Sequence, residues 1–203
     1  YEVLDNFQKH SYPWGIMVNT DGNRFVDEGE DLRNHTYVKF GREIMKQPNR
    51  TAIQIFDQKT IPLLRDEYRI RQVTKVSGNS IAELAQELEI NVSALTKTID
   101  EFNAACKPGN FNPSILDGVA TTGLNPNKTN WALPMDEPPF EAFITTTGVT
   151  FTFGGLKVDD KGSVLDNNDR SISGLFAAGE LVGGLFYENY PGGSGLMAGA
   201  VYG

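Results

Sequence analysis

The last quarter of the chain is dense in glycine. Of the 21 glycines among 203 residues, 11 fall between Gly148 and Gly195. Glycine lets a backbone pass close to another group without a Cβ in the way, and it tolerates positive φ. The stretch therefore predicts a backbone that runs against a bound group or against another chain segment.

Within that stretch, residues 174–180 predict a short buried strand that ends in Gly179 and Glu180. A glycine-rich loop follows, and Leu196 lies in the first turn of an expected helix. The N-terminus of a helix offers free N–H groups and a positive dipole end, which suit an electron-rich ligand. An acid at the strand end can accept hydrogen bonds from ribose or ribityl hydroxyls. A glycine-rich turn that only packs a helix on a sheet is the alternative.

The remainder reads as a mixture of strands and helices. Strands are expected at 15–19, 24–27, 51–57, 140–147, 151–159 and 163–166, and the Asp21-Gly22 pair predicts a hairpin turn between the first two. Helices are expected at 36–47, 60–69, from Ser80 onward, and from about Ser93 to Cys106. Residues 107–139 predict a loop-rich connection.

Composition excludes several function classes. The net charge of −8 and pI near 4.8 argue against nucleic acid and anionic membrane surfaces as partners. A single cysteine, Cys106, rules out an internal disulfide. No apolar run approaches the roughly 20 residues that span a bilayer, and the start of the chain lacks the pattern of a signal peptide. We expect no membrane insertion and a cytoplasmic protein. His10 and His35 are the only histidines, so we predict no metal site.

Three ordered stretches resemble one family. Residues 174–180, GLFAAGE, resemble the C-terminal flavin-binding signature of the fumarate reductase and succinate dehydrogenase flavoproteins. Residues 15–28, GIMVNTDGNRFVDE, resemble the family's entry into its capping domain, and 152–159 resemble the return to its flavin domain. Within the family, residues 26–46, 64–71 and 186–195 look most like tricarballylate dehydrogenase.

The resemblance implies an α+β chain. It joins a capping domain of the fumarate reductase flavoprotein type to the C-terminal piece of an FAD-binding, Rossmann-like α/β domain. Residues 1–19 would end the flavin domain, 20–140 would form the cap, and 141–203 would return to the flavin domain. The family's strand–GxGxxG–helix unit is absent from these residues. A missing N-terminal half is therefore an expected partner.

The resemblance also implies a set of cofactor contacts. Glu180 would bind the ribityl chain of FAD, with Gly155 and Gly179 beside it. Ser194, Gly195 and Leu196 would lie at the pyrimidine edge of the flavin ring, where the helix N-terminus favours negative charge on the reduced ring.

Arg33 is the predicted catalytic residue, because the resemblance places a proton-donating arginine just after the entry hairpin. Arginine stays protonated in water, so it can exchange a proton only in a dry site linked to other acids. Glu28, Glu30 and Asp31 are the expected relay. A surface pairing of Arg33 with these neighbours is the alternative.

Two positions depart from the family. Phe151 replaces a carboxylate-binding histidine, and Tyr190 replaces a carboxylate-clamping arginine. Phenylalanine cannot bind a carboxylate, and tyrosine offers one hydroxyl in place of a bidentate fork. We expect Tyr190 to act as a hydrogen-bond donor or proton relay. Phe151, Thr152 and His35 would line the substrate pocket.

The implied activity is FAD-dependent oxidation of a CH–CH bond of a small carboxylic acid, or its reverse, with tricarballylate as the example. The electron acceptor is not identified by the sequence. A 3-ketosteroid-type flavin dehydrogenase is the rival within this class. A non-catalytic module that docks onto a separate nucleotide-binding half is the rival outside it.

Overall fold

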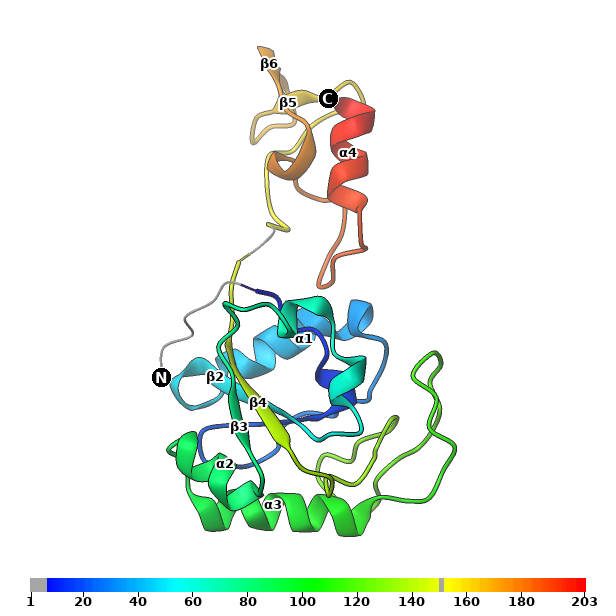
Figure 1. Cartoon of the computed structure of the whole chain (residues 1–203). Helices are drawn as coiled ribbons and strands as arrows, with labels where there is room; N and C mark the ends of the chain where they lie inside the picture. Colours follow the sequence, from blue (N-terminus) through cyan, green and yellow to red (C-terminus); the bar gives the residue numbers. More distant parts are fainter. Residues whose placement is uncertain (1–6, 150–151) are drawn as a thin grey trace. The chain divides into compact units, whose positions relative to one another are not determined.

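The computed structural model describes residues 7–149 and 152–203. The chain forms two compact units, Tyr1–Thr147 and Gly148–Gly203, which are described one at a time (Figure 1). The strands and α-helices of the first unit are β1 (Ile16–Val18), α1 (Arg33–Met45), β2 (Thr51–Phe56), β3 (Val76–Gly78), α2 (Ile81–Glu87), α3 (Val92–Ala105) and β4 (Phe140–Thr146). Its 3₁₀ helices are η1 (Tyr12–Trp14), η2 (Pro48–Arg50), η3 (Ile61–Leu63) and η4 (Asp66–Tyr68).

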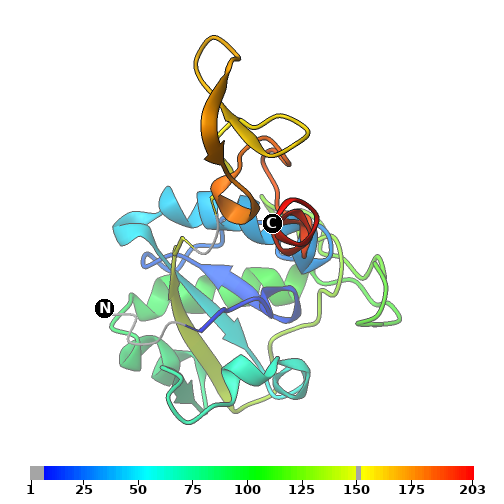
Figure 2. The ribbon, with the colours of Figure 1, turned by 90° about the horizontal axis from the view of Figure 1, so that it is seen from above.

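The first unit is built on an antiparallel sheet with strand order β1-β2-β4-β3. Helices α2 and α3 pack on one face, and α1 lies across the other (Figure 2). Residues of β2 alternate between the two faces, so that Ile53 and Ile55 meet α2 and α3 while Ala52 meets α1. All six residues of β2 are consequently buried.

Helix ends follow the expected side-chain chemistry. The Ser80 hydroxyl accepts from the Glu83 N–H at the start of α2, and the Asn91 side chain accepts from the Ala94 N–H at the start of α3. Each contact satisfies an N–H that has no partner within the helix. The helices predicted at 36–47, from Ser80 and from about Ser93 to Cys106 are confirmed, with small shifts at their ends. The strands predicted at 15–19, 51–57 and 140–147 are confirmed in the same way.

Two expectations for the first unit are wrong. Residues 24–27 form no strand, only an isolated bridge between Val18 and Arg24, because the Arg24 side chain turns inward to bind Glu28. Residues 60–69 form the two 3₁₀ turns η3 and η4 in place of one helix.

The loop-rich connection at 107–139 is ordered by its own polar side chains. Asp117 accepts from the N–H groups of Val119 and Trp131, and the indole N–H of Trp131 donates to the carbonyl of Ile115 at 2.9 Å. Trp131 is 1% exposed. The connection therefore wraps the unit as a fixed strap.

The second unit contains the hairpin β5 (Ser163–Leu165) and β6 (Ser171–Phe176), the 3₁₀ helix η5 (Gly179–Leu181) and the helix α4 (Ser194–Tyr202). The expected strand at 151–159 is wrong: among its described residues only Leu156 and Val158 form isolated bridges, and Phe151 lies outside the described residues. The expected buried strand at 174–180 is also wrong, because every residue of β6 is exposed and Gly179–Leu181 turns as η5. No helix among the described residues is both long and apolar enough to cross a bilayer.

Candidate functional site

The N-terminus of α4 carries unused hydrogen-bonding groups. Gly193 precedes the helix with φ of 84°, a conformation that glycine adopts without strain. The Ser194 Oγ is buried and has no hydrogen-bond partner in the described part of the chain. The Leu196 N–H also forms no hydrogen bond there, although Leu196 itself is 78% exposed. A buried hydroxyl without a partner is costly, so these groups suit a polar ligand.

Tyr190 reaches the same helix end. The Gly195 N–H donates to the Tyr190 hydroxyl at 3.4 Å. The Tyr190 ring packs edge-on against Phe186, with centroids 5.2 Å apart, and Phe186 packs in the same way against Phe153. Predicted residues Tyr190, Ser194 and Gly195 are thus brought together beside an aromatic row.

Glu180 and Thr152 are joined. The backbone N–H of Thr152 donates to Glu180 Oε1 at 2.9 Å, and its hydroxyl lies 3.4 Å from the same oxygen. Both residues are exposed. The contact brings a predicted substrate residue and a predicted ribityl ligand into one cluster.

Gly155 and Gly179 have packing roles of their own. A Cβ on Gly155 would lie 2.4 Å from the Leu181 carbonyl oxygen and 2.6 Å from the Gly183 nitrogen, so the two backbone segments require glycine there. Gly179 has φ of 73°, and a Cβ on it would lie 3.8 Å from Gly199 Cα in α4. The close approach of residues 181–183 therefore accounts for Gly155, and the positive φ accounts for Gly179, beside any contact with a ligand.

This donor set fits the flavin that the sequence resemblance implies. The unpaired Leu196 N–H at a helix N-terminus and the orphaned Ser194 hydroxyl match the electron-rich carbonyl edge of an isoalloxazine ring. The carboxylate of Glu180 matches a hydroxylated chain.

In the first unit, Arg33 is the first residue of α1 and is partly buried. The Tyr12 hydroxyl donates to the Arg33 carbonyl at 3.2 Å and contacts Thr36 Oγ1 at 2.8 Å. The Arg33 guanidinium forms no ion pair with any described residue. Residues near the positive end of a helix dipole normally include acids, and the first turn of α1 has none.

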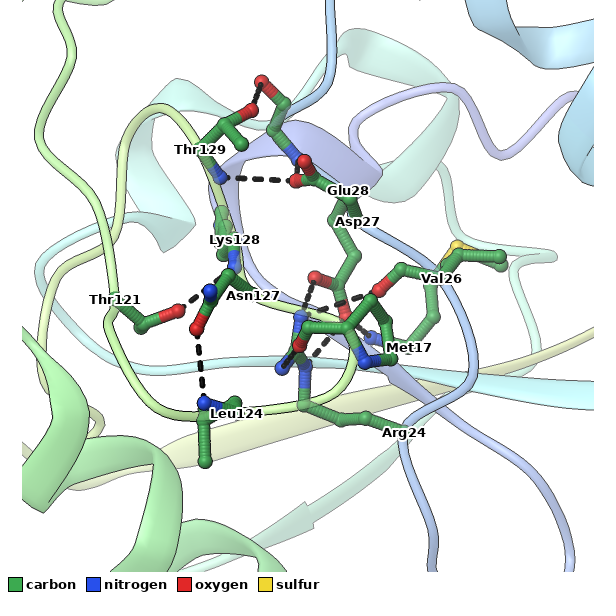
Figure 3. A network of polar contacts seen from close by, with 12 residues as sticks. Met17, Arg24, Val26, Asp27, Glu28, Thr121, Leu124, Asn127, Lys128 and Thr129 are labelled. Carbon is green, nitrogen blue, oxygen red and sulfur yellow. Dashed lines mark hydrogen bonds and ion pairs between the residues drawn. The ribbon is translucent and has the colours of Figure 1, made fainter.

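Glu28 is not a relay partner of Arg33. Its side chain is fully buried and pairs with Arg24 at 2.5 Å. The same carboxylate accepts from the Met17 N–H at 2.7 Å, as Figure 3 shows. Arg24 in turn donates to the carbonyls of Pro126 and Val26. This closed network joins the 19–28 loop to the strap.

The other two relay candidates are also engaged elsewhere. Glu30 pairs with Lys39 at 2.5 Å. Asp31 pairs with His35 at 3.0 Å, where the His35 side chain is 62% exposed. The expected relay of Glu28, Glu30 and Asp31 is therefore not formed in this structure, because each acid is bound to a basic side chain other than Arg33.

Lys128 is fully buried and donates to the carbonyls of Pro13 and Gly15, each at 2.7 Å. Burial lowers the pKa of Lys128 to about 8, although Glu28 opposes the shift. Its ammonium satisfies backbone acceptors at the end of η1, so it holds the segment that carries Tyr12.

The sequence analysis did not place His10 near Arg33 and α1. Burial, followed by the charges of Arg33 and Arg65, lowers the pKa of His10 to about 4. Its ring packs on Tyr37 of α1 with centroids 5.2 Å apart. No local sequence signal points to this cluster, because its members lie far apart in the chain.

Comparison with known proteins identifies the family. The chain matches the model of the FAD binding domain over residues 7–196. It is 32% identical to a probable fumarate reductase Ifc3 of Shewanella frigidimarina over 191 residues, which cover 93% of this chain and 29% of that protein. It is 28% identical to a 3-oxosteroid 1-dehydrogenase of Mycolicibacterium smegmatis over 215 residues, which cover 93% of this chain and 36% of that protein.

Among solved structures, the open conformation of a flavocytochrome c3 fumarate reductase matches with a TM-score of 0.70 and 28% identity. That match covers 98% of this chain and 35% of the other. The chain thus spans about a third of the length of these proteins. These matches confirm the resemblance to the fumarate reductase flavoproteins, and the chain belongs to the FAD binding domain family, with FAD as its cofactor.

Proposed function

We propose that this chain is part of an FAD-dependent oxidoreductase that acts on a CH–CH bond next to a carboxylate, in the manner of tricarballylate dehydrogenation or of fumarate reduction. The observation that supports it best is the N-terminus of α4, where a buried Ser194 hydroxyl has no partner. The family match supplies the class of chemistry.

In this proposal the second unit holds the cofactor. Ser194, Gly195 and Leu196 direct their donors at the pyrimidine edge of the flavin, and Glu180 binds the ribityl hydroxyls. Gly155 and Gly179 keep the backbone close enough for these contacts. Bound FAD supplies the hydride acceptor or donor at N5. Donors already aimed at the ring edge stabilise the negative charge that develops there.

The Ser194 contact can be tested without turnover. Ser194→Ala removes one hydrogen bond, and we expect FAD affinity to fall about tenfold. Fluorescence titration of FAD into the apoprotein measures it. Ser173→Ala, in the exposed strand β6, is the matched control. Equal affinity of the two variants would contradict the contact.

Arg33 is the proposed proton donor to substrate carbon, or acceptor in the reverse direction. Among the described residues of the first unit it has no ion-pair partner, and its backbone carbonyl accepts from the Tyr12 hydroxyl. We assign residues 20–140 to the capping domain, with 1–19 and 141–203 to the flavin domain. Strands β1 and β4 both belong to the four-stranded sheet. The chain would therefore pass from the flavin domain to the cap just after β1, and back again at the start of β4.

A substrate other than fumarate is proposed from the two departures. Tyr190 gives one hydroxyl at the place of a clamping arginine, and Phe151 gives none. Tricarballylate, a larger acid, is the proposed substrate, with Thr152 and His35 as further contacts.

Anaerobic mixing with tricarballylate tests the activity. We expect bleaching of the flavin absorbance near 450 nm, slowed at least about 100-fold by Arg33→Gln, in line with loss of a general acid–base group. Lys39→Gln, on the same helix but paired with Glu30, should leave the rate unchanged. A flavin that stays oxidised with tricarballylate and with succinate would refute the proposal.

A 3-ketosteroid-type dehydrogenase is the second candidate. The Tyr190 hydroxyl and the Gly195 N–H lie 3.4 Å apart, so both could donate to one ketone oxygen. Flavin bleaching by 4-androstene-3,17-dione and not by carboxylic acids would favour this candidate, and Tyr190→Phe should then abolish it.

A non-catalytic module is the third candidate. Large apolar side chains are exposed on the second unit, which suits docking onto a separate nucleotide-binding half; they include Leu175, Phe176, Leu181, Leu185, Leu196, Met197 and Val201. A chain that is colourless once unbound FAD has been removed, and that retains yellow FAD only with that half, would support this reading. A yellow chain that turns over substrate alone would exclude it.

A further inference from the structure

Three segments of the first unit bring basic side chains to one place. Arg33 and Tyr37 lie four residues apart and so share one face of α1, and the His10 ring packs on Tyr37 with centroids 5.2 Å apart. The next residue, Ser11, accepts the Arg65 N–H with its Oγ at 3.1 Å. The segment that carries His10 therefore contacts both α1, through Tyr37, and the backbone of Arg65.

The cations in this cluster are incompletely neutralised. Arg33 has no ion pair among the described residues. Glu67 is the one described acid whose charge acts on His10, and it pairs with Arg65 at 3.0 Å. The groups that face His10 are Arg33 and Tyr37 from α1 and Arg65 and Glu67 from the 64–68 segment. Two positive charges against one negative charge leave room for an anion.

We propose that His10, flanked by Arg33 and Arg65, is a carboxylate anchor that takes up one proton from solvent when a polycarboxylate binds. This rests on the proposed substrate class. It supplies a cationic anchor in a chain whose Phe151 and Tyr190 cannot form the two that the family uses.

The linkage follows from electrostatics. In the free protein the imidazole is neutral at physiological pH, because burial and the two guanidinium groups keep the proton off. A bound carboxylate offsets those charges, and the pKa of His10 rises toward its ordinary value near 6.5. The imidazole then gains a proton and becomes a second donor to the same anion.

The experiment uses citrate as the probe. Its central carbon bears no hydrogen, so it cannot be dehydrogenated across a CH–CH bond, and binding is measured apart from turnover. Citrate is titrated calorimetrically into the oxidised, FAD-loaded protein near pH 6, in buffers of different ionisation enthalpy, which report the protons taken up.

We expect His10→Gln to remove most of one proton from the uptake and to weaken citrate binding roughly tenfold. Lys39→Gln, which removes a cation of the same helix that pairs with Glu30, should preserve both. Arg65→Gln should weaken citrate binding by a similar factor. The side chain of Arg69 donates to the Pro62 carbonyl, so Arg69→Gln should leave citrate binding unchanged.

Three results would overturn the anchor: no citrate binding, the same proton uptake in His10→Gln as in the wild type, or unchanged affinity in Arg65→Gln. Each is independent of flavin reduction. Citrate binding with His10-linked uptake, in a protein whose flavin no acid reduces, would retain the anchor and reject the proposed oxidoreduction.

Discussion

Strands β2 and β6 each have six residues, yet all six are buried in β2 and all six are exposed in β6. β2 lies inside a four-stranded sheet with helices on both faces, whereas β6 pairs only with β5 among the described strands. Both strands contain Ile and Phe. Burial is therefore decided by the neighbours of a strand, and the two units should respond differently to the same kind of substitution.

The largest contrast is expected at ion pairs. Glu28→Ala leaves the buried Arg24 charge unpaired, and we expect a loss of about 3–5 kcal/mol in the free energy of unfolding. Lys157→Ala breaks the exposed pair with Asp169 in the second unit, where both side chains are 65% exposed, and should have no measurable effect. Urea unfolding of both variants measures the two losses in the free energy of unfolding, and losses of similar size would contradict the prediction.

The next contrast concerns apolar side chains in the two strands. Ile53→Ala in β2 opens a cavity at a fully buried position and should cost about 2–5 kcal/mol. Leu175→Ala in β6, at 45% exposure, should change stability by less than about 0.5 kcal/mol. Thermal unfolding of the chain without partners is the measurement. A large loss for Leu175→Ala would show that the second unit has a core of its own.

Acid should destabilise the first unit at a higher pH than the second. The folded pKa of His10 is about 4 against an ordinary 6.5, so between these values the unfolded chain binds more protons. Stability is thus lost as pH falls from 6.5 to 4, by at most about 3 kcal/mol. His10→Gln should flatten this dependence.

In the second unit, hydrogen bonds from Arg170 and Ser163 N–H groups lower the pKa values of Asp166 and Asp159, respectively. Their stabilising contribution is present above the ordinary value of 3.8 and is lost only below it. Unfolding followed separately by signals of the two units, as a function of pH, checks the order. Loss of the second unit first would contradict it.

The smallest contrast lies at two helix starts. Ser80→Ala removes the cap of α2 and should cost about 1 kcal/mol. Ser194→Ala removes a hydroxyl that caps nothing, so the stability of the FAD-free chain should not fall. Circular dichroism during urea unfolding distinguishes the two. A loss at Ser194 equal to that at Ser80 would imply a contact that this structure lacks.

The sequence by itself determined features that depend on a few neighbouring residues. A helix start at Ser80 needs only one hydroxyl and one N–H three residues later. Helical spacing alone puts Leu95, Ile99 and Phe102 on one face of α3. The order of the family motifs likewise indicated an FAD-binding chain before any coordinates were considered.

Only the tertiary structure decided which charges meet. Glu28 was expected to serve Arg33, but it lies buried against Arg24, and Lys128 binds carbonyls more than 110 residues away. His10 and Arg65 join Arg33 through contacts between distant segments. Electrostatic and hydrogen-bond energies depend on distance and burial in space, which residue spacing along the chain does not specify.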